Sequence, residues 1–209
     1  MNYENYKAAR DRAWEILIET EVGELPVPVT KICRAIGAEY HSYASAAEIV
    51  RGLGLGDLMR QTDGFCIYLD GIPRIFYDET MPVPRRRFTL AHEIGHIALG
   101  HVTEGQYTPV NREPSPGDSA VETQANQFAA RLLAPACVLH ELGCLEAQQI
   151  AELCNISMAA ARFRSERMTE LERRQKYYLS PLERQVRDQF LPFLRQKSGS
   201  SGNSDSRFP

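Results

Sequence analysis

The stretch RFTLAHEIGHIALGH, residues 87–101, contains the pattern that decides both the fold and the chemistry. Its histidines, His92 and His96, are four residues apart, so on a helix both imidazoles point the same way and can chelate one zinc ion. The neighbouring positions are apolar nearly all round, which predicts a buried helix from Arg85 to Leu99 that ends at Gly100. The alternative is a pair of surface histidines on an ordinary helix. With five histidines in 209 residues, chance gives roughly 0.01 such motifs, so we favour the metal site.

Glu93 follows His92 and is rotated by about 100° around the helix axis, toward the rim of the predicted site. We expect it to take a proton from a zinc-bound water and to pass that proton to the leaving amine, rather than to bind the metal. Zinc lowers the pKa of such a water to about 7 and polarises the scissile carbonyl. The residues therefore predict peptide hydrolysis with Glu93 as the catalytic base.

A catalytic zinc site takes three protein ligands and leaves one position open, so a third ligand is needed. His101 misses the metzincin spacing by one residue and lies beyond the predicted helix end, where a histidine favoured by the helix macrodipole is the better interpretation. Glu122 begins the stretch ETQANQFAARLLAP, residues 122–135, and can reach the zinc from a neighbouring helix. It also fits a capping box with Ser119, so the residues alone leave both roles open. Asn126, one turn later, either supports a ligand or is a polar edge residue.

The rest of the chain predicts further helices and one hairpin. Asp70-Gly71 between two apolar, aromatic runs is a strong hairpin signal, and Pro73 suggests that the second run is an edge strand. Glycines leave residues 45–60 ambiguous, and Pro, Gly and polar residues predict a loop over 103–118. A helix–turn–helix is predicted over residues 147–168, with Ser157 as the N-cap of its second helix. The other predicted elements are helices at 3–19, 29–36, 119–133 and 181–195, and strands at 38–43, 65–69 and 72–77.

Composition narrows the class of protein. The formal net charge is −3, which argues against a nucleic-acid-binding protein as a whole, although the stretch from Arg162 to Lys197 is basic. The five cysteines include no CxxC pair, which favours small buried residues in a reducing compartment. With neither an apolar signal segment nor a run long enough to span a membrane, we expect a cytoplasmic protein without a membrane partner.

Residues 87–101 resemble the signature of the ImmA/IrrE family of zinc metallopeptidases, and residues 122–135 resemble its second motif. The resemblance covers roughly residues 8–168 and implies that Glu122 is the third ligand, in a two-His, one-Glu, gluzincin-like zinc site. It also implies an α+β fold. A zincin-like domain with N-terminal helices and a small antiparallel sheet would span residues 1–143, and a helix–turn–helix-like helical part would span 144–197. The Ser- and Gly-rich composition of residues 198–209, which lie outside the resemblance, predicts a disordered tail.

Family members typically cleave a helix–turn–helix repressor of the XRE type and so induce mobile-element or stress-response genes. The resemblance therefore implies an XRE-type repressor as substrate, and the chain length favours the phage or mobile-element type without a sensor domain. Two alternatives are a DNA-binding regulator and a repressor-binding protein that does not cut. Arg162, Arg164 and Arg167 favour the first, but interspersed glutamates make a mixed, solvated face more plausible, and direct DNA binding is not expected. The presence of Glu93 disfavours the second. Spacing does not select the oxyanion stabiliser among Tyr77, Tyr107, Arg131 and His140.

Overall fold

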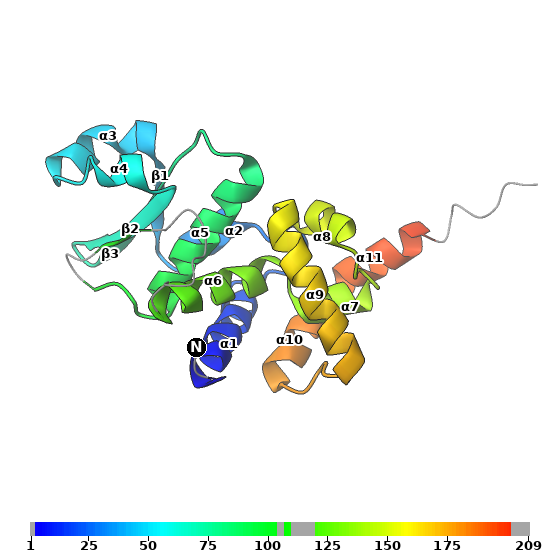
Figure 1. Ribbon diagram of the computed structural model, residues 1–209. Coiled ribbons are helices and arrows are strands. Elements are labelled where there is room, and N and C mark those ends of the chain that lie inside the picture. The colour runs from blue at the N-terminus through cyan, green and yellow to red at the C-terminus, as the bar shows by residue number, and fades with distance from the viewer. Residues whose placement is uncertain (1–2, 104–106, 110–119, 202–209) are drawn as a thin grey trace, which may run out of the picture. The chain divides into compact units, whose positions relative to one another are not determined.

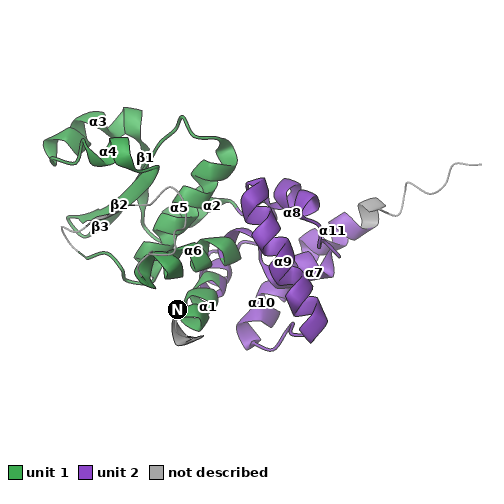
Figure 2. Ribbon diagram, viewed as in Figure 1, with its two compact units in different colours: residues 1–13, 28–131 green, residues 14–27, 132–209 purple. Residues whose placement is uncertain are grey.

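The computed structural model describes residues 3–103, 107–109 and 120–201 of the chain (Figure 1). The fold is mixed α+β, as predicted, and the chain divides into two compact units (Figure 2). Unit 1 comprises residues 1–13 and 28–131, and unit 2 comprises residues 14–27 and 132–209. The predicted domain boundary between residues 143 and 144 stays a prediction.

The sheet of unit 1 is built around the predicted hairpin, β2 (Gly64–Leu69) and β3 (Ile72–Tyr77). Its strands pair antiparallel with Leu69 opposite Ile72, so the turn consists of two residues. Asp70 and Gly71 have φ angles of 53° and 74°, the left-handed conformation that such a turn needs to match the twist of its strands. The strand order is β1-β3-β2-β4, with β1 at Glu39–Ser42 and β4 at Tyr107–Pro109.

Three predictions about the sheet were wrong. The sheet is mixed rather than antiparallel, because β1 pairs parallel with β3 after the chain has crossed over through α3 (Tyr43–Gly52) and α4 (Leu58–Gln61). β3 is therefore an internal strand, and Pro73 is tolerated because the register with β1 begins only at Arg74. The third error concerns β4, which falls in the segment predicted to be a loop and is too short to produce a recognisable alternation.

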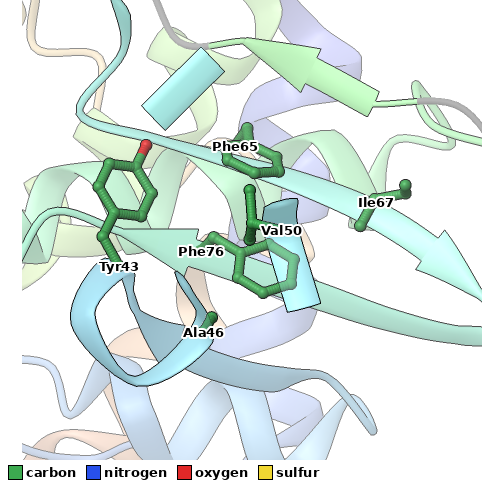
Figure 3. Packing of buried hydrophobic residues seen from close by; sticks show 6 residues of the cluster. All are labelled: Tyr43, Ala46, Val50, Phe65, Ile67 and Phe76. Atoms are coloured by element: carbon green, nitrogen blue, oxygen red, sulfur yellow. The ribbon is translucent and has the colours of Figure 1, made fainter. Parts of the chain in front are cut away.

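The two faces of β2 carry different side chains, as strand alternation requires. Phe65 and Ile67 face a buried cluster with α3, in which the Phe65 and Phe76 rings stack at 5.1 Å (Figure 3). The segment 45–60, which was ambiguous in sequence, is helical up to Gly52 and again from Leu58, and Ser42 caps α3, its Oγ accepting from the Ser45 amide. Gly64 and Cys66 point the other way, and a Cβ on Gly64 would meet Thr89 of α5 (Val83–Ala98). The sheet thus separates the α3 cluster from the helix that carries the histidines.

The remaining helices of unit 1 follow the predicted pattern. α5 has Pro84 in its first turn and ends before Gly100, whose φ is +69°. α2 (Val29–Ala35) ends before Gly37, φ +72°, as expected from its sequence. α6 spans Ala120–Leu133 and lies against α5 where Phe128 approaches Gly95. α1 (Tyr3–Glu19) has the predicted bounds, and its residues from 14 onward belong to unit 2.

In the part that the structure describes, unit 2 contains helices joined by turns and no strands. Asn155, with φ 49°, ends α8 (Ala147–Cys154), and the Ser157 Oγ caps α9 (Met158–Arg174), as predicted, by accepting from the Ala160 amide. α7 (Ala136–Glu141) was not predicted, and the helix expected over 181–195 is divided at Phe190 into α10 (Pro181–Gln189) and α11 (Leu191–Ser201). α11 includes residues 198–201 of the predicted disordered tail, where the Ser198 Oγ donates to the Leu194 carbonyl; residues 202–209 lie outside the described part.

Two expectations from composition can be compared with the structure. All five cysteines are buried and none forms a disulfide, which confirms that they are small core residues. Among the described helices, none combines the length and the apolar character needed to cross a membrane.

Candidate metal centre

The two histidines of α5 lie side by side in the interior of unit 1. His92 is 1% exposed and His96 is 0% exposed, because α5 packs against the sheet and α2, and side chains of α6 contact this turn of it. Their spacing of one helical turn brings the two Nε2 atoms to 2.8 Å from each other. Two buried ring nitrogens this close are directed at one point, where a cation could bind both.

Glu122 reaches the same point from the first turn of α6. Its Oε2 lies 3.3 Å from His92 Nε2, and its Oε1 lies 3.5 Å from His96 Nε2. Ligand atoms bound tetrahedrally to zinc at about 2.05 Å are about 3.3 Å apart, so the three side chains fit such an ion with small adjustments. The structure therefore brings together the three residues that the sequence named as ligands, in a group that could hold a metal ion.

Gly95 sets the distance between the helices that carry these ligands. A Cβ at this position would lie 3.0–3.3 Å from atoms of the Phe128 side chain on α6. Glycine removes that obstacle and lets α6 approach α5 closely enough for a short carboxylate side chain to reach both imidazoles. Gly95 thus serves the packing of α6 on α5, while the other residues of the HEIGH motif, His92, Glu93 and His96, carry the chemistry.

Glu93 lies fully buried beside the three candidate ligands. Burial raises the pKa of its carboxyl to about 7; nearby His92 and Cys66 lower this pKa, and Glu122 adds to the rise. Neither carboxylate oxygen has a hydrogen-bond partner among the described residues. A buried carboxyl that accepts no hydrogen bond lowers the stability of the fold. A water molecule bound to a neighbouring metal ion would supply the missing donor.

The electrostatics give the candidate ligands the protonation states that metals bind. Burial lowers the pKa of His96 to about 4, although the Glu122 carboxylate beside it acts in the opposite direction. Burial alone would raise the pKa of Glu122, but the adjacent His92 and His96 imidazoles outweigh that effect and lower it to about 2. At neutral pH, His96 is therefore neutral and Glu122 ionised, so neither has to lose a proton before a cation binds.

Comparison with protein-family models gives one match, to Peptidase_M78, described as the IrrE N-terminal-like domain, over residues 54–166. The match covers more than half of the 209 residues and includes the sheet hairpin, α5 and α6. The chain belongs to this peptidase family. The resemblance to the ImmA/IrrE family is thereby confirmed. No curated protein matches the chain.

Besides the candidate ligand Glu122, two side chains of α6 contact histidines of the site: Asn126 contacts His92, and Gln124 contacts His101. Asn126 Oδ1 lies 2.9 Å from His92 Nδ1, the nitrogen that faces away from Glu122, a contact that fits the supporting role, one of the two roles the sequence left open for Asn126. His101 Nδ1 lies 3.3 Å from His96 Nδ1, and His101 Nε2 lies 3.1 Å from Gln124 Oε1. Burial lowers the pKa of His101, so the sequence-based interpretation of it as a cation at the helix C-terminus is not favoured. Spacing alone did not indicate the His101–Gln124 contact, although the Gly100 stop signal could have suggested it.

The four residues considered for oxyanion stabilisation have different surroundings. Arg131 Nη1 donates to the Gln127 carbonyl, and its guanidinium lies 4.4 Å from the centre of the Tyr6 ring. His140, in unit 2, lies with Nδ1 2.6 Å from Glu172 Oε1. Tyr77 is the half-buried last residue of β3, and the side chain of Tyr107 lies outside the described part. Arg131 and His140 are thus already engaged within the protein.

Proposed function

We propose that the protein is a zinc-dependent endopeptidase in which His92, His96 and Glu122 hold the metal and Glu93 is the general base. The observation that carries this proposal is the convergence of two imidazole nitrogens and a carboxylate beside Glu93, a buried carboxyl whose oxygens accept no hydrogen bond of good geometry from the described residues. Membership of a peptidase family makes amide hydrolysis the reaction to expect from that arrangement.

Two imidazoles and one carboxylate favour zinc over the harder cations. Calcium and magnesium prefer sites made entirely of oxygen atoms, whereas zinc binds neutral imidazole and carboxylate together, with one position left for the reaction. When bound here, the metal would lower the pKa of a water and polarise the scissile carbonyl.

The chain's own residues then handle the proton. Glu93, with a pKa near 7, is ionised in a large fraction of molecules at neutral pH and can take a proton from the attacking water. The same carboxyl, once protonated, is a sufficiently strong acid to return the proton to the leaving amine. Glu93 is buried on α5 beside Cys66 of β2, and this position keeps its carboxyl within the site through both steps.

We further infer that the substrate is a helix–turn–helix repressor of the XRE type and that α8 and α9 form a helix–turn–helix-like element that docks it. The start of α9 supports docking, because Met158, Arg162 and Phe163 are exposed there, Phe163 by 74%. Such a substrate implies action in the cytoplasm. Direct DNA binding is less favoured, since Arg164, one of the three arginines available for phosphates, is only 7% exposed.

The test is to incubate the protein with the XRE-type repressor encoded beside its gene, with zinc and with a chelator, and to follow intact repressor on gels. We expect cleavage only with zinc, and none by Glu93→Gln. The exposed Glu48→Gln variant is the matched control and should cleave normally. Equal loss of intact repressor with wild type and Glu93→Gln would remove the catalytic proposal. Cleavage of an unrelated unfolded peptide but not of the repressor would remove only the substrate assignment.

A further inference from the structure

The C-terminal cap of α5 folds the chain back against the metal centre. Gly100 adopts the left-handed conformation, its amide donates to the Ile97 carbonyl at 3.1 Å, and the His101 amide donates to the His96 carbonyl at 2.9 Å. This turn places the His101 ring edge-on to the His96 ring, with centroids 5.2 Å apart. His101 therefore contacts the side of His96 that faces away from Glu122.

The contacts of His101 form a chain whose direction follows from hydrogen-bond chemistry. Gln124 Oε1 can only accept, so the His101 nitrogen 3.1 Å away, Nε2, must carry a proton and donate it. A neutral imidazole has one N–H, so His101 Nδ1 is then an acceptor. The proton between the two Nδ1 atoms, 3.3 Å apart, consequently belongs to His96. With its proton on Nδ1, His96 has a free lone pair on Nε2.

We propose that His101 and Gln124 are positioning residues that hold His96 in the tautomer whose Nε2 binds the metal. The inference rests on the proposed zinc site and deepens it. Asn126 gives the same result for His92, whose Nδ1 donates to Asn126 Oδ1. Two residues of α6 thus prepare the two imidazoles of α5 for one cation, Asn126 directly and Gln124 through His101.

The consequence of losing this chain is specific. With no acceptor at Nδ1, His96 can place its proton on Nε2 and donate it to Glu122 Oε1, 3.5 Å away, which directs an N–H toward the metal position. Zinc must then displace that proton before it binds. Partners of metal-binding histidines typically change metal affinity by 10–100-fold when removed, and the same range is expected here.

The experiment uses two substitutions at Gln124, which is half-buried, so both variants should fold. Gln124→Met removes the acceptor and keeps the approximate length of the side chain, whereas Gln124→Glu keeps an oxygen that accepts from His101. His101→Phe is a second way to break the chain while keeping a ring. Zinc affinity is measured at pH 8 by competition with a chromophoric chelator. The tautomer of His96 is measured in the metal-free protein from its ring nitrogen chemical shifts, and circular dichroism checks folding.

We expect His96 to carry its proton on Nδ1 in the wild type and in Gln124→Glu, and to shift toward Nε2 in Gln124→Met and His101→Phe. Zinc affinity should fall by about 10-fold or more in the last two variants and stay at or above the wild-type value in Gln124→Glu. Equal affinity losses in Gln124→Met and Gln124→Glu, or a wild-type His96 protonated on Nε2, would overturn the inference. If wild type binds and uses zinc while the variants are unchanged, only this inference fails; if wild type binds no zinc, the proposed function fails with it.

Discussion

Replacing Glu93 with glutamine should stabilise the metal-free protein at neutral and alkaline pH while abolishing cleavage. The pKa of Glu93 rises from 4.5 to about 7 on folding, so the folded state holds a proton that the unfolded state has already lost between these values. The contribution of this carboxyl to stability is therefore present below pH 4.5 and is lost as the pH rises through 7. A rise of the pKa from 4.5 to about 7 corresponds to about 3 kcal/mol, and glutamine, which is neutral at all pH values, avoids this loss.

Other groups in the site titrate over an overlapping range with the opposite sign. His96 and Glu122 both have lowered pKa values, about 4 and about 2, so their contributions are present at high pH and are lost as the pH falls. Because both residues are present in wild type and in Glu93→Gln, the difference between the two proteins isolates Glu93. That difference should be below about 1 kcal/mol at pH 5 and approach about 3 kcal/mol at pH 8.

The assay is urea unfolding of chelator-treated wild type and Glu93→Gln at pH 5, 6, 7 and 8, with the exposed Glu48→Gln as control. Zinc should reduce the difference at pH 8, because a cation beside Glu93 favours the ionised carboxylate. A pH-independent difference, or a Glu93→Gln variant less stable than wild type at pH 8, would refute the argument that burial raises this pKa.

Substitutions at three further positions test the packing around the site and its polar contacts. Gly95→Ala should reduce zinc affinity, measured by chelator competition, because its Cβ would press on Phe128 at 3.0–3.3 Å, while stability changes by less than about 1 kcal/mol since alanine favours the helix. Gly64→Ala should destabilise by about 1–3 kcal/mol in urea unfolding, because its Cβ would overlap Thr89 and lie 2.8 Å from the carbonyl oxygen of the neighbouring strand. Asn126→Ala should weaken zinc binding about 10-fold and Asn126→Asp should not; equal effects would argue against the hydrogen bond to the metal-binding ring.

The parts of the site that lie on one helix could be predicted from sequence, because helical spacing alone puts His92 and His96 on one face and Glu93 beside them. The position of Glu122 is different in kind. It depends on how closely α6 packs against α5, and periodicity carries no information about that distance, so the residues alone left a capping role equally open. The resemblance to a family motif favoured the ligand role, and the close approach at Gly95 supplies the physical reason why the carboxylate reaches.

The hairpin was predictable for the same local reason, since Asp70-Gly71 specifies its turn. The parallel pairing of β1 with β3 was not, because the partners are more than thirty residues apart and a four-residue strand pairs equally well in either direction by pattern. His101 shows a third case. Its spacing argued against metzincin-type ligation, which stays a prediction. The left-handed Gly100 returns it to the far side of His96, a consequence that follows from the cap geometry and not from spacing along the helix.

One physical cause, removal of water from the centre of unit 1, accounts for two properties that the proposed reaction needs. Burial disfavours charge, so it raises the pKa of an acid and lowers that of a base. It therefore brings Glu93 to about 7, where one carboxyl can both accept and return a proton, and it keeps His96 neutral so that its lone pair is available to a cation. Glu122 escapes the same effect only because the imidazoles of His92 and His96 lie beside it. A substitution that admits water to this centre would therefore weaken the base and the metal site together, even if it touched no ligand.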